Sequence, residues 1–433
     1  MSTRLQWASL QVRRRLWFRA TAFSAVAVAV ALVGTVVEPR VPAALSGRID
    51  TEAVGALLDI LAASMLSVTI FSLTVVIAAH ASATSNATPR STLVLSEDNI
   101  SHNALGTFVG GFIFSLAGMV ALHAGLYDGR GRVTLYVVTL AVIGVIVATL
   151  LRWIDHVSSM GRVGEITHRV ESRTAEVMRE QRDRPCMGGT PLLDPGAIPD
   201  GAIPLHADRY GYVLNIDMEA LQAAARDAGL QVHVAGLPGT FADPCRPLAW
   251  VTGGEPEEES RGLLRGAFAI GDARTFDEDP RFGLIVLGEI ASRALSPAMN
   301  DPGTAIDVLG RAVRLLAITA GGTVRQAEVK YPDVHVPALD PGCLFDDVFT
   351  PIARDGAAMV EVGIRLQAAL RSLALLGDAR YARLALQYSE MALGRAEQAL
   401  RFEPDRERVR AAAARVRAIA GAGGGAASGD HGR

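Results

Sequence analysis

Two arginines and a helix start give residues 274–305 the clearest potential for binding chemistry. A helix that begins at Pro302 presents free backbone N–H groups and a partial positive charge, which together bind anions. Arginine pairs well with phosphate or carboxylate. One interpretation is that Arg274 and Arg293 converge on a small anionic ligand at this helix start. The alternative is an internal lock, in which Asp301 caps its own helix and Asp279 or Asp301 pairs with an arginine. The candidate residues for the anion site or the lock are Arg274, Asp279, Arg293, Asn300, Asp301 and Thr304.

The sequence carries no recognisable catalytic or metal-binding pattern. It has no GxSxG elbow, no HExxH and no pair of histidines at metal-ligand spacing. Lys330 is the only lysine, and it stands in neither a Walker motif nor a carrier hairpin. Cys186, Cys245 and Cys343 are far apart, so we interpret them as reduced thiols rather than as a disulfide frame or a zinc site. We therefore predict no enzyme activity, no cofactor and no bound metal.

Residues 53–80 form an apolar stretch that also carries hydroxyl groups. Residues 60–79 contain no charge, and a helix needs about 20 apolar residues to cross a hydrocarbon core. At about 100° per residue, Ser64, Ser67 and Thr74 share one face of this helix. These hydroxyls either bond the carbonyl one turn back or a neighbouring helix, or they line a path for water or ions. The three residues are therefore our candidates for lining a pore.

Composition and hydropathy predict further spans. Hydrophobic residues make up 50% of the chain and the mean hydropathy is +0.26, whereas a net charge of −3 argues against nucleic-acid binding. We predict transmembrane helices at about residues 20–37, 57–79, 104–126 and 133–151. The third contains Gly106 and Gly110 in GxxxG spacing, followed by Gly111, Ser115 and Gly118, which lets helices approach closely. Arginines cluster before the first span and after the fourth, which predicts that both termini lie in the cytoplasm.

The expected fold is that of a mainly α membrane protein, with four transmembrane helices followed by a cytoplasmic α+β unit and a helical bundle. Strands at 210–216, 230–234 and 247–251, with a helix at 218–228, are predicted for the α+β unit. We interpret residues 80–103 either as a solvated loop or as an amphipathic or re-entrant segment at the mouth of a pore, and Asp155 with His156 as a solvated turn. The predicted domains are a transmembrane domain (1–160), a helical extension and linker (161–204), a small α/β unit (205–255), a helical cytoplasmic domain (256–420) and a disordered tail (421–433).

Three groups of residues resemble a known family. One group lies in and after the second span, another in the strand–helix unit, and the most specific in residues 274–305. The groups are Ser64, Met65, Val68, Phe71, Ser72, Thr74, Pro89 and Arg90; then Gly211, Tyr212, Val213, Ile216, Asp217, Pro238 and Gly239; then Arg274, Thr275, Asp279, Pro280, Phe282, Gly283, Ala291, Arg293, Ala294, Leu295, Ser296, Pro297, Asn300, Asp301, Pro302, Thr304 and Ala305.

With these residues the chain resembles the bacterial membrane family known as domain of unknown function 2254, from the first span to about Leu376. It departs from that family at residues 95–98, where a more basic, glutamine-bearing stretch is usual. The resemblance implies a multi-pass protein of the bacterial inner membrane with a cytoplasmic domain, and it brings no established activity.

Taken together, these features favour a homo-oligomeric channel or transport-like protein. The second span would line the path, and the cytoplasmic domain would bind an ion or small anionic ligand or assemble the oligomer. The alternative is a non-conducting membrane scaffold or signalling protein whose cytoplasmic domain binds a partner.

Overall fold

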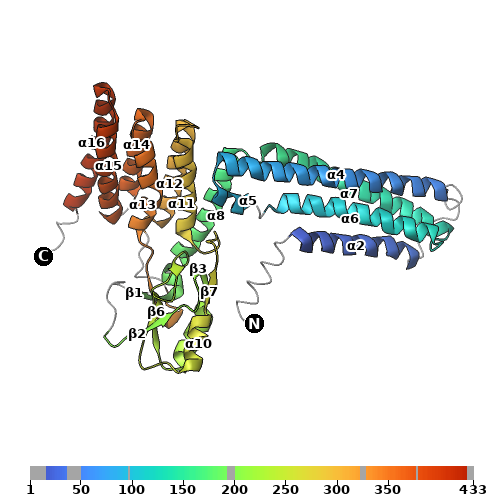
Figure 1. Ribbon diagram of the computed structural model, residues 1–433, viewed down its shortest axis with the longest axis horizontal. Helices are drawn as coiled ribbons and strands as arrows, with labels where there is room; N and C mark the ends of the chain where they lie inside the picture. The colour runs from blue at the N-terminus through green and yellow to red at the C-terminus, as the bar shows by residue number, and fades with distance from the viewer. Residues whose placement is uncertain are drawn as a thin grey trace. The chain divides into compact units, whose positions relative to one another are not determined.

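The computed structural model describes residues 16–36, 50–95, 98–192, 200–321, 328–376 and 379–426 (Figure 1). The chain divides into two compact units. Residues 1–85 and 95–165 form the first, here called the membrane unit, and residues 86–94 and 166–433 form the second, here called the sheet–helix unit. The tail predicted at 421–433 begins within a helix that ends at Ala426, and residues 427–433 lie outside the described part.

The membrane unit consists of long helices that lie side by side (Figure 1). They are α2 (Leu16–Val36), α4 (Thr51–Asn86), α6 (Asn99–His123) and α7 (Gly129–Ser159). Within the described residues, three helices are long and apolar enough to cross a membrane, namely those at Thr51–Ser82, Asn99–His123 and Gly129–Ser158. The apolar part described for α2, Ala20–Ala31, is shorter, so the span predicted at 20–37 is not confirmed.

Helix α6 is the centre of this unit because its small residues admit its neighbours closely. A Cβ atom on Gly106 would lie 2.9 Å from the ring of Phe23 in α2, and one on Gly111 would lie 2.8 Å from Ile146 in α7 and 3.4 Å from Met65 in α4. Of the most apolar window of α6, 56% is buried, compared with 22% for α4 and for α7. The predicted role of the small residues in helix packing is thus confirmed.

The polar segment after α4 is largely helical rather than a loop. Helix α4 continues to Asn86, and η1 (Pro89–Ser91) and α5 (Thr92–Leu95) follow before α6. Of the two interpretations of residues 80–103, the solvated loop is therefore wrong for most of the described part of this segment. Residues 86–94 belong to the sheet–helix unit, where Arg90 pairs with Glu289. Helix α7 extends past the predicted end of the fourth span at residue 151 and reaches Ser159, and Gly161, with φ of +81°, separates it from α8 (Val163–Asp183).

The sheet–helix unit contains two sheets. The strands are β1 (Gly189–Leu192), β2 (Ile203–His206), β3 (Gly211–Ile216), β4 (Gln231–Val234), β5 (Phe241–Ala242), β6 (Pro247–Thr252), β7 (Phe268–Gly271) and β8 (Tyr331–Pro337). A mixed sheet has the order β1-β8-β4-β6-β2, with β8 parallel to both neighbours, and an antiparallel sheet has the order β5-β3-β7. Helix α9 (Met218–Asp227) packs its apolar face on the shared core, and Asp217 caps it as its position predicts.

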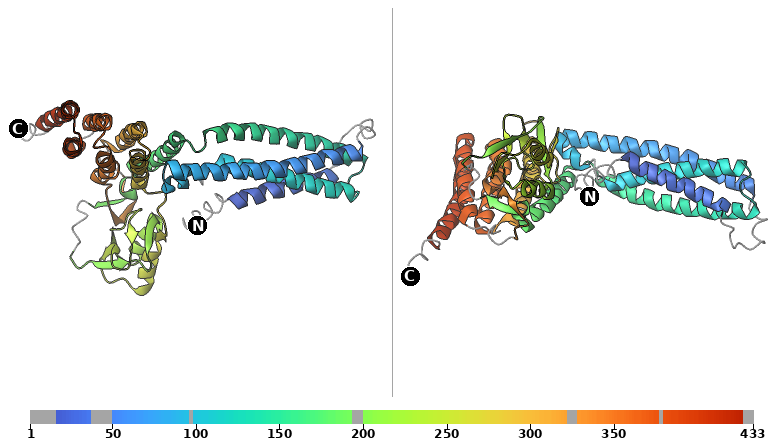
Figure 2. Two further views of the ribbon diagram at one scale, coloured as in Figure 1. Left: turned by 45° about the horizontal axis from the view of Figure 1, so that its top comes forward. Right: turned by 90° about the horizontal axis from the view of Figure 1, so that it is seen from below.

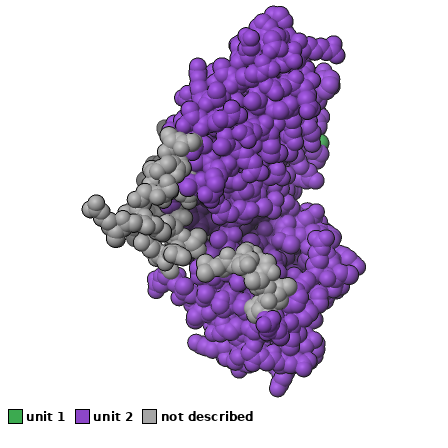
Figure 3. Space-filling model, turned by 90° about the vertical axis from the view of Figure 1, so that its left-hand side faces the viewer, with its two compact units in different colours: residues 1–85, 95–165 green, residues 86–94, 166–433 purple. Residues whose placement is uncertain are grey.

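The predicted strands around α9 are confirmed, but the sheets draw strands from a wider part of the sequence. Strands β7 and β8 lie within residues 256–420, which we expected to be helical. Helices α10 (Glu258–Gly266), α11 (Pro280–Ala294), α12 (Pro302–Thr319), α13 (Pro341–Asp355), α14 (Val360–Leu376), α15 (Ala379–Ala399) and α16 (Glu403–Ala426) complete the unit. The left view of Figure 2 shows the C-terminal helices, which form a helical bundle, nearly end-on, and Figure 3 shows this unit in purple as a space-filling model.

Candidate functional site

The sheet–helix unit contains a cavity of about 260 Å³ between the sheets and the start of α11. Its walls come from α8, from η2 (Pro185–Gly188), from the turn between β4 and β5, from the start of α11 and from the end of β8. Charged side chains face it next to apolar ones. The lining residues that matter below are Cys186, Gly239, Arg274, Glu278, Asp279 and Arg281. Two of the six residues that the sequence singles out, Arg274 and Asp279, thus lie in one cavity.

Arg274 and Asp279 form the predicted lock. The guanidinium donates from Nη2 and Nε to Oδ2 of Asp279 at 2.6 and 2.7 Å, and it lies 5.3 Å from the ring centre of Phe282. The other carboxylate oxygen accepts the N–H groups of Arg281 and Phe282, both at 3.1 Å, and so caps α11. Burial raises the pKa of Asp279, although Arg274 and the two backbone N–H groups act against this rise. The carboxylate therefore holds both the arginine and the helix start.

The turn at Pro238 and Gly239 closes over this pair. Gly239 has a φ of +90°, and a Cβ atom there would lie 2.1 Å from Oδ2 of Asp279 and 2.9 Å from Nη2 of Arg274. Only glycine combines this conformation with so close an approach. Two of the motif groups by which the chain resembles a known family, 238–239 and 274–283, therefore meet at the cavity.

A second arginine, Arg281, lies on the same rim. Its Nε and Nη2 donate to the two carboxylate oxygens of Asp347 in α13 at 2.8 and 2.9 Å. This two-point pairing raises the pKa of Arg281. The cavity wall consequently carries two guanidinium groups that are held in place, each paired with an aspartate of its own, and one of these aspartates, Asp279, lines the cavity as well.

Glu278 is a lining residue of the cavity whose pKa lies near neutral pH. Asn215 of β3 donates to its Oε1, while its buried Oε2 has no hydrogen-bond partner within the part of the chain that the structure describes. Burial, reinforced by the negative charges of Glu180 and Asp277, raises the pKa of Glu278 to about 7. At neutral pH this carboxyl group is thus balanced between a hydrogen-bond donor and a negative charge.

This pKa predicts a pH dependence of stability. The unfolded chain releases the Glu278 proton near pH 4.5, whereas the folded chain retains it up to about pH 7. The stabilisation is complete below the lower value and is lost as the pH rises to the upper one, a loss of up to roughly 3 kcal/mol. The midpoint temperature of thermal unfolding of the detergent-solubilised protein should therefore fall as the pH rises from 5 to 8. In the Glu278→Gln variant this fall should be smaller, and an equal fall would contradict the assignment.

The remaining candidates of the 274–305 segment lie elsewhere. Arg293 is exposed in the last turn of α11, about 20 Å along the helix from its capped start, so Arg274 and Arg293 do not converge. Asp301 caps α12 by accepting the N–H of Thr304 at 3.1 Å and its hydroxyl at 2.6 Å, and the bonds to Thr304 lower the pKa of Asp301. Asn300 precedes it with a φ of +47°. This group forms a local helix cap and does not line the cavity.

In the membrane unit, Ser64, Ser67 and Thr74 are exposed on α4. The hydroxyls of Ser67 and Thr74 each donate to the carbonyl one turn back, at 3.0 Å. These three side chains therefore take no part in packing α4 within the unit.

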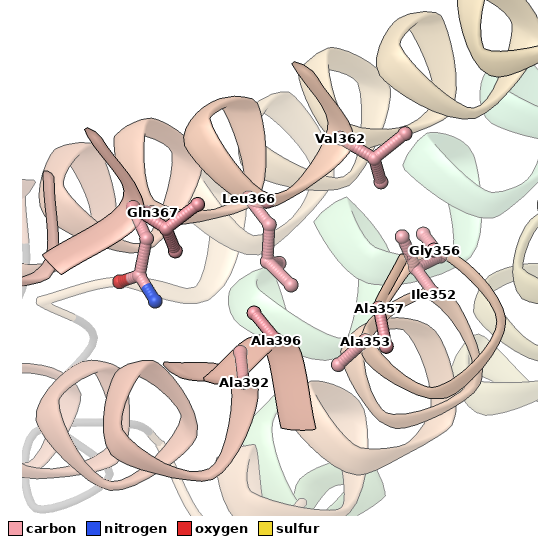
Figure 4. A pocket seen from close by; sticks show the side chains of 11 residues that line it. Ile352, Ala353, Gly356, Ala357, Val362, Leu366, Gln367, Ala392 and Ala396 are labelled. Atoms are coloured by element: carbon pink, nitrogen blue, oxygen red, sulfur yellow. The ribbon is translucent and has the colours of Figure 1, made fainter. Parts of the chain in front are cut away.

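A second cavity lies inside the helical bundle, lined among others by Val362 and Leu366 of α14, Ala392 and Ala396 of α15, and Ile352 of α13 (Figure 4). Its volume of about 10 Å³ is close to the minimum for one water molecule, which excludes a substrate site. No cluster of three or more potential metal ligands occurs among the described residues.

Of the residues that line the first cavity, the sequence pattern predicts Arg274 and Asp279 as site residues but not Glu278, Arg281 or Cys186. The first two directly flank Asp279 and Pro280, so a signal was present in the charged run before α11. Cys186 comes from a remote segment, and nothing in its spacing relates it to α11.

The comparisons with known proteins agree with this architecture. Residues 13–372 match the family described as "Predicted membrane protein (DUF2254)". Uncharacterized proteins of Mycobacterium tuberculosis (strain H37Rv) and Mycobacterium bovis are each 31% identical over 215 residues, which is 47% of this chain and 40% of theirs. The chain thus covers less than half the length of these relatives. No solved structure matches it. Since the family match covers most of the sequence, this chain belongs to the DUF2254 family of predicted membrane proteins.

Proposed function

We propose that this protein is a homo-oligomeric channel or transport-like protein of the bacterial inner membrane. The observation that supports it best is the exposed hydroxyl face of α4, formed by Ser64, Ser67 and Thr74. Helices α4 and α7 each leave most of their apolar surface uncovered in a single chain. The three or four spans of a single chain are too few to enclose a path. A path along α4 therefore needs further copies of the chain.

The proposed orientation follows from the arginines. Those before the first predicted span and after the fourth support a cytoplasmic location for both termini and for the sheet–helix unit. In this proposal the cavity at Arg274 and Arg281 binds a small anionic ligand, because both guanidinium groups are rigidly held and Glu278, when protonated, adds a donor. The unit then acts as a sensor for the membrane helices, with no reaction and no cofactor of its own.

Ion flux from liposomes that contain the purified protein tests the path along α4. The Ser64→Leu and Ser67→Leu variants should each reduce flux by roughly tenfold, if each hydroxyl lowers the barrier by about 1.4 kcal/mol. Leu73→Phe adds bulk to a different exposed face of the same helix and should leave flux unchanged. Inorganic phosphate on the cytoplasmic side should change the flux of the wild type more than that of the Glu278→Gln variant. Equal flux in all α4 variants would exclude the lining role.

A non-conducting scaffold is the second candidate function, and one observation favours it. The hydroxyls of Ser67 and Thr74 are satisfied by their own helix, and the large side chains Ile60 and Phe71 lie exposed on the same face. Such a face suits lipid as well as water. A monomer in detergent, without flux in liposomes, would favour the scaffold, whereas a closed oligomer with flux would favour the channel.

A further inference from the structure

A buried acid–base pair joins α6 and α7 at one end of the membrane unit. Nε2 of His156 lies 2.7 Å from Oδ2 of Asp98, and their side chains are 10% and 6% exposed. The same carboxylate oxygen accepts the N–H of Ser101 at 3.3 Å and caps α6. His156 is therefore not part of a solvated turn, contrary to the sequence-based interpretation, although its neighbour Asp155 is exposed. Ionisable groups inside a membrane unit carry a large desolvation penalty and usually serve a function.

Three further polar atoms are buried nearby without a hydrogen-bond partner among the described residues. They are Oγ of Ser72, Oγ of Ser101 and Nε1 of Trp153. Ser72, Ser101 and Trp153 are respectively 0%, 1% and 2% exposed. A buried polar group without a partner costs about 1–3 kcal/mol, so three of them in one small domain call for an explanation.

These three groups belong to stripes that face one common core. Val68 and Val75 flank Ser72 at helical spacing on α4, Ala104 and Phe108 follow Ser101 on α6, and Ile146 and Leu150 precede Trp153 on α7. All six of these apolar residues pack in the same cluster as Trp153 itself, whose ring meets Phe108 edge-on at 6.3 Å. The unpartnered atoms therefore sit on the inner faces of three different helices.

They also lie at nearly the same level. Gly118 of α6 touches Leu58 and Leu135, and Gly111 touches Met65 and Ile146, so α6 runs antiparallel to α4 and α7. Ser72 lies two turns beyond Met65 on α4, and Trp153 lies two turns beyond Ile146 on α7. Ser101 lies about three turns before Gly111 on α6, which is the same direction in space because α6 runs antiparallel to the other two helices. Asp98 lies one turn before Ser101 at the start of α6, and His156 lies one turn after Trp153 on α7. A polar layer thus adjoins the acid–base pair.

We propose that Asp98 and His156 form a proton-binding site of the membrane unit, supplied through water molecules held by Ser72, Ser101 and Trp153. Buried water is held by two to four polar groups, and two hydroxyls with an indole N–H in the same core supply that number. A carboxylate and an imidazole in hydrogen-bond contact share one exchangeable proton, and uptake of a second proton breaks their charge balance.

Other titratable groups surround the pair and serve as controls. On α4, Nδ1 of His80 lies 2.9 Å from the carbonyl of Val76 in its own helix. On α6, His102 follows Asp98 by one turn, and on α7, Arg152 and Asp155 are exposed. Glu97 lies outside the described residues, and the part of α2 with described side chains, 20–31, contains no titratable group.

Trp153 provides a direct readout. In this chain, replacement of Trp7, Trp17 and Trp250 by phenylalanine leaves Trp153 as the sole indole. Its emission in detergent or nanodiscs should shift with pH through one transition. That transition should be lost in Asp98→Asn and His156→Gln but retained in His80→Gln and His102→Gln. Asparagine caps helices as well as aspartate does, so the Asp98→Asn chain should keep its fold.

A second measurement needs no change at the pair. Exchange of H2O for D2O should increase Trp153 emission if water contacts the indole, and Ser72→Ala with Ser101→Ala should reduce that increase. A dry, pH-insensitive Trp153 in the otherwise unaltered chain, or a transition that survives removal of both Asp98 and His156, would overturn the proposal. Neither readout depends on ion flux, so the outcome is independent of the channel hypothesis.

Discussion

Replacement of Asp279 by alanine should destabilise the sheet–helix unit by roughly 3–5 kcal/mol. The change removes the acceptor for two N–H groups at the start of α11 and leaves Arg274, whose side chain is only 19% exposed, without its carboxylate. An uncompensated buried charge is the larger of these two effects, because the loss of a helix cap alone costs about 1 kcal/mol. Thermal unfolding of the detergent-solubilised protein, with hydrogen exchange of α11 peptides, measures the loss.

Asp301 offers a matched control. It caps α12 in the same Asp-Pro context, but it is exposed and forms no ion pair with an arginine among the described residues. The Asp301→Ala variant should therefore lose only about 1 kcal/mol. Combining Asp279→Ala with Arg274→Met should recover part of the large loss, since apolar groups often replace a buried ion pair without penalty. Equal losses at Asp279 and Asp301 would show that only capping matters.

A second large effect is expected at Gly283, where α11 crosses α8. A Cβ atom at this position would lie 1.7 Å from Oγ1 and 2.7 Å from Cβ of Thr174. Thr174 is 2% exposed and its hydroxyl donates to the carbonyl of Val170 at 2.6 Å, so it has no free space to turn into. Gly283→Ala should destabilise the unit by about 1–3 kcal/mol, as overpacking does. The midpoint of thermal unfolding should fall by about 2–4 °C for each kcal/mol.

The same substitution at Gly310 should have the opposite sign. Gly310 lies in the middle of α12, and a Cβ atom there would meet nothing within 4 Å. Because alanine favours a helix over glycine by up to about 1 kcal/mol, Gly310→Ala should stabilise the protein. If both variants shift the midpoint in the same direction, helix propensity rather than the contact with Thr174 governs Gly283.

Local signals in the sequence were sufficient for many elements. Asp217, Asp301 and Pro302 indicated helix starts, and the strands expected at 210–216, 230–234 and 247–251 lie near the observed bounds of β3, β4 and β6. Strand β8 was not predictable in this way. Its sequence, YPDVHVP, contains two prolines, which argue against a strand, and the strands that it pairs with, β1 and β4, come from earlier parts of the sequence. Whether such a segment forms a strand depends on its distant pairing partners and not on its own sequence.

The same division holds for the site. Arg274 and Asp279 stand five residues apart, so a pairing between them was a reasonable expectation, and the structure confirms it. The convergence of Arg293 was wrong because α11 is a continuous helix that separates it from Arg274. The burial of His156 was missed because its partner, Asp98, is on a different helix. Sequence spacing predicts contacts within an element, whereas contacts between elements depend on the tertiary fold.

The position of β8 within the mixed sheet has a consequence for synthesis on the ribosome. Strands β1 and β4 are made first, but both pair with β8, which emerges only after α10, β7, α11 and α12. Between Thr252 and Tyr331 the nascent chain therefore carries two strand edges without their neighbour, for roughly 5–15 s at 5–20 residues per second. During that interval the apolar spans are already available for membrane insertion, which would tether the unfinished sheet and keep its open edges apart from those of other chains.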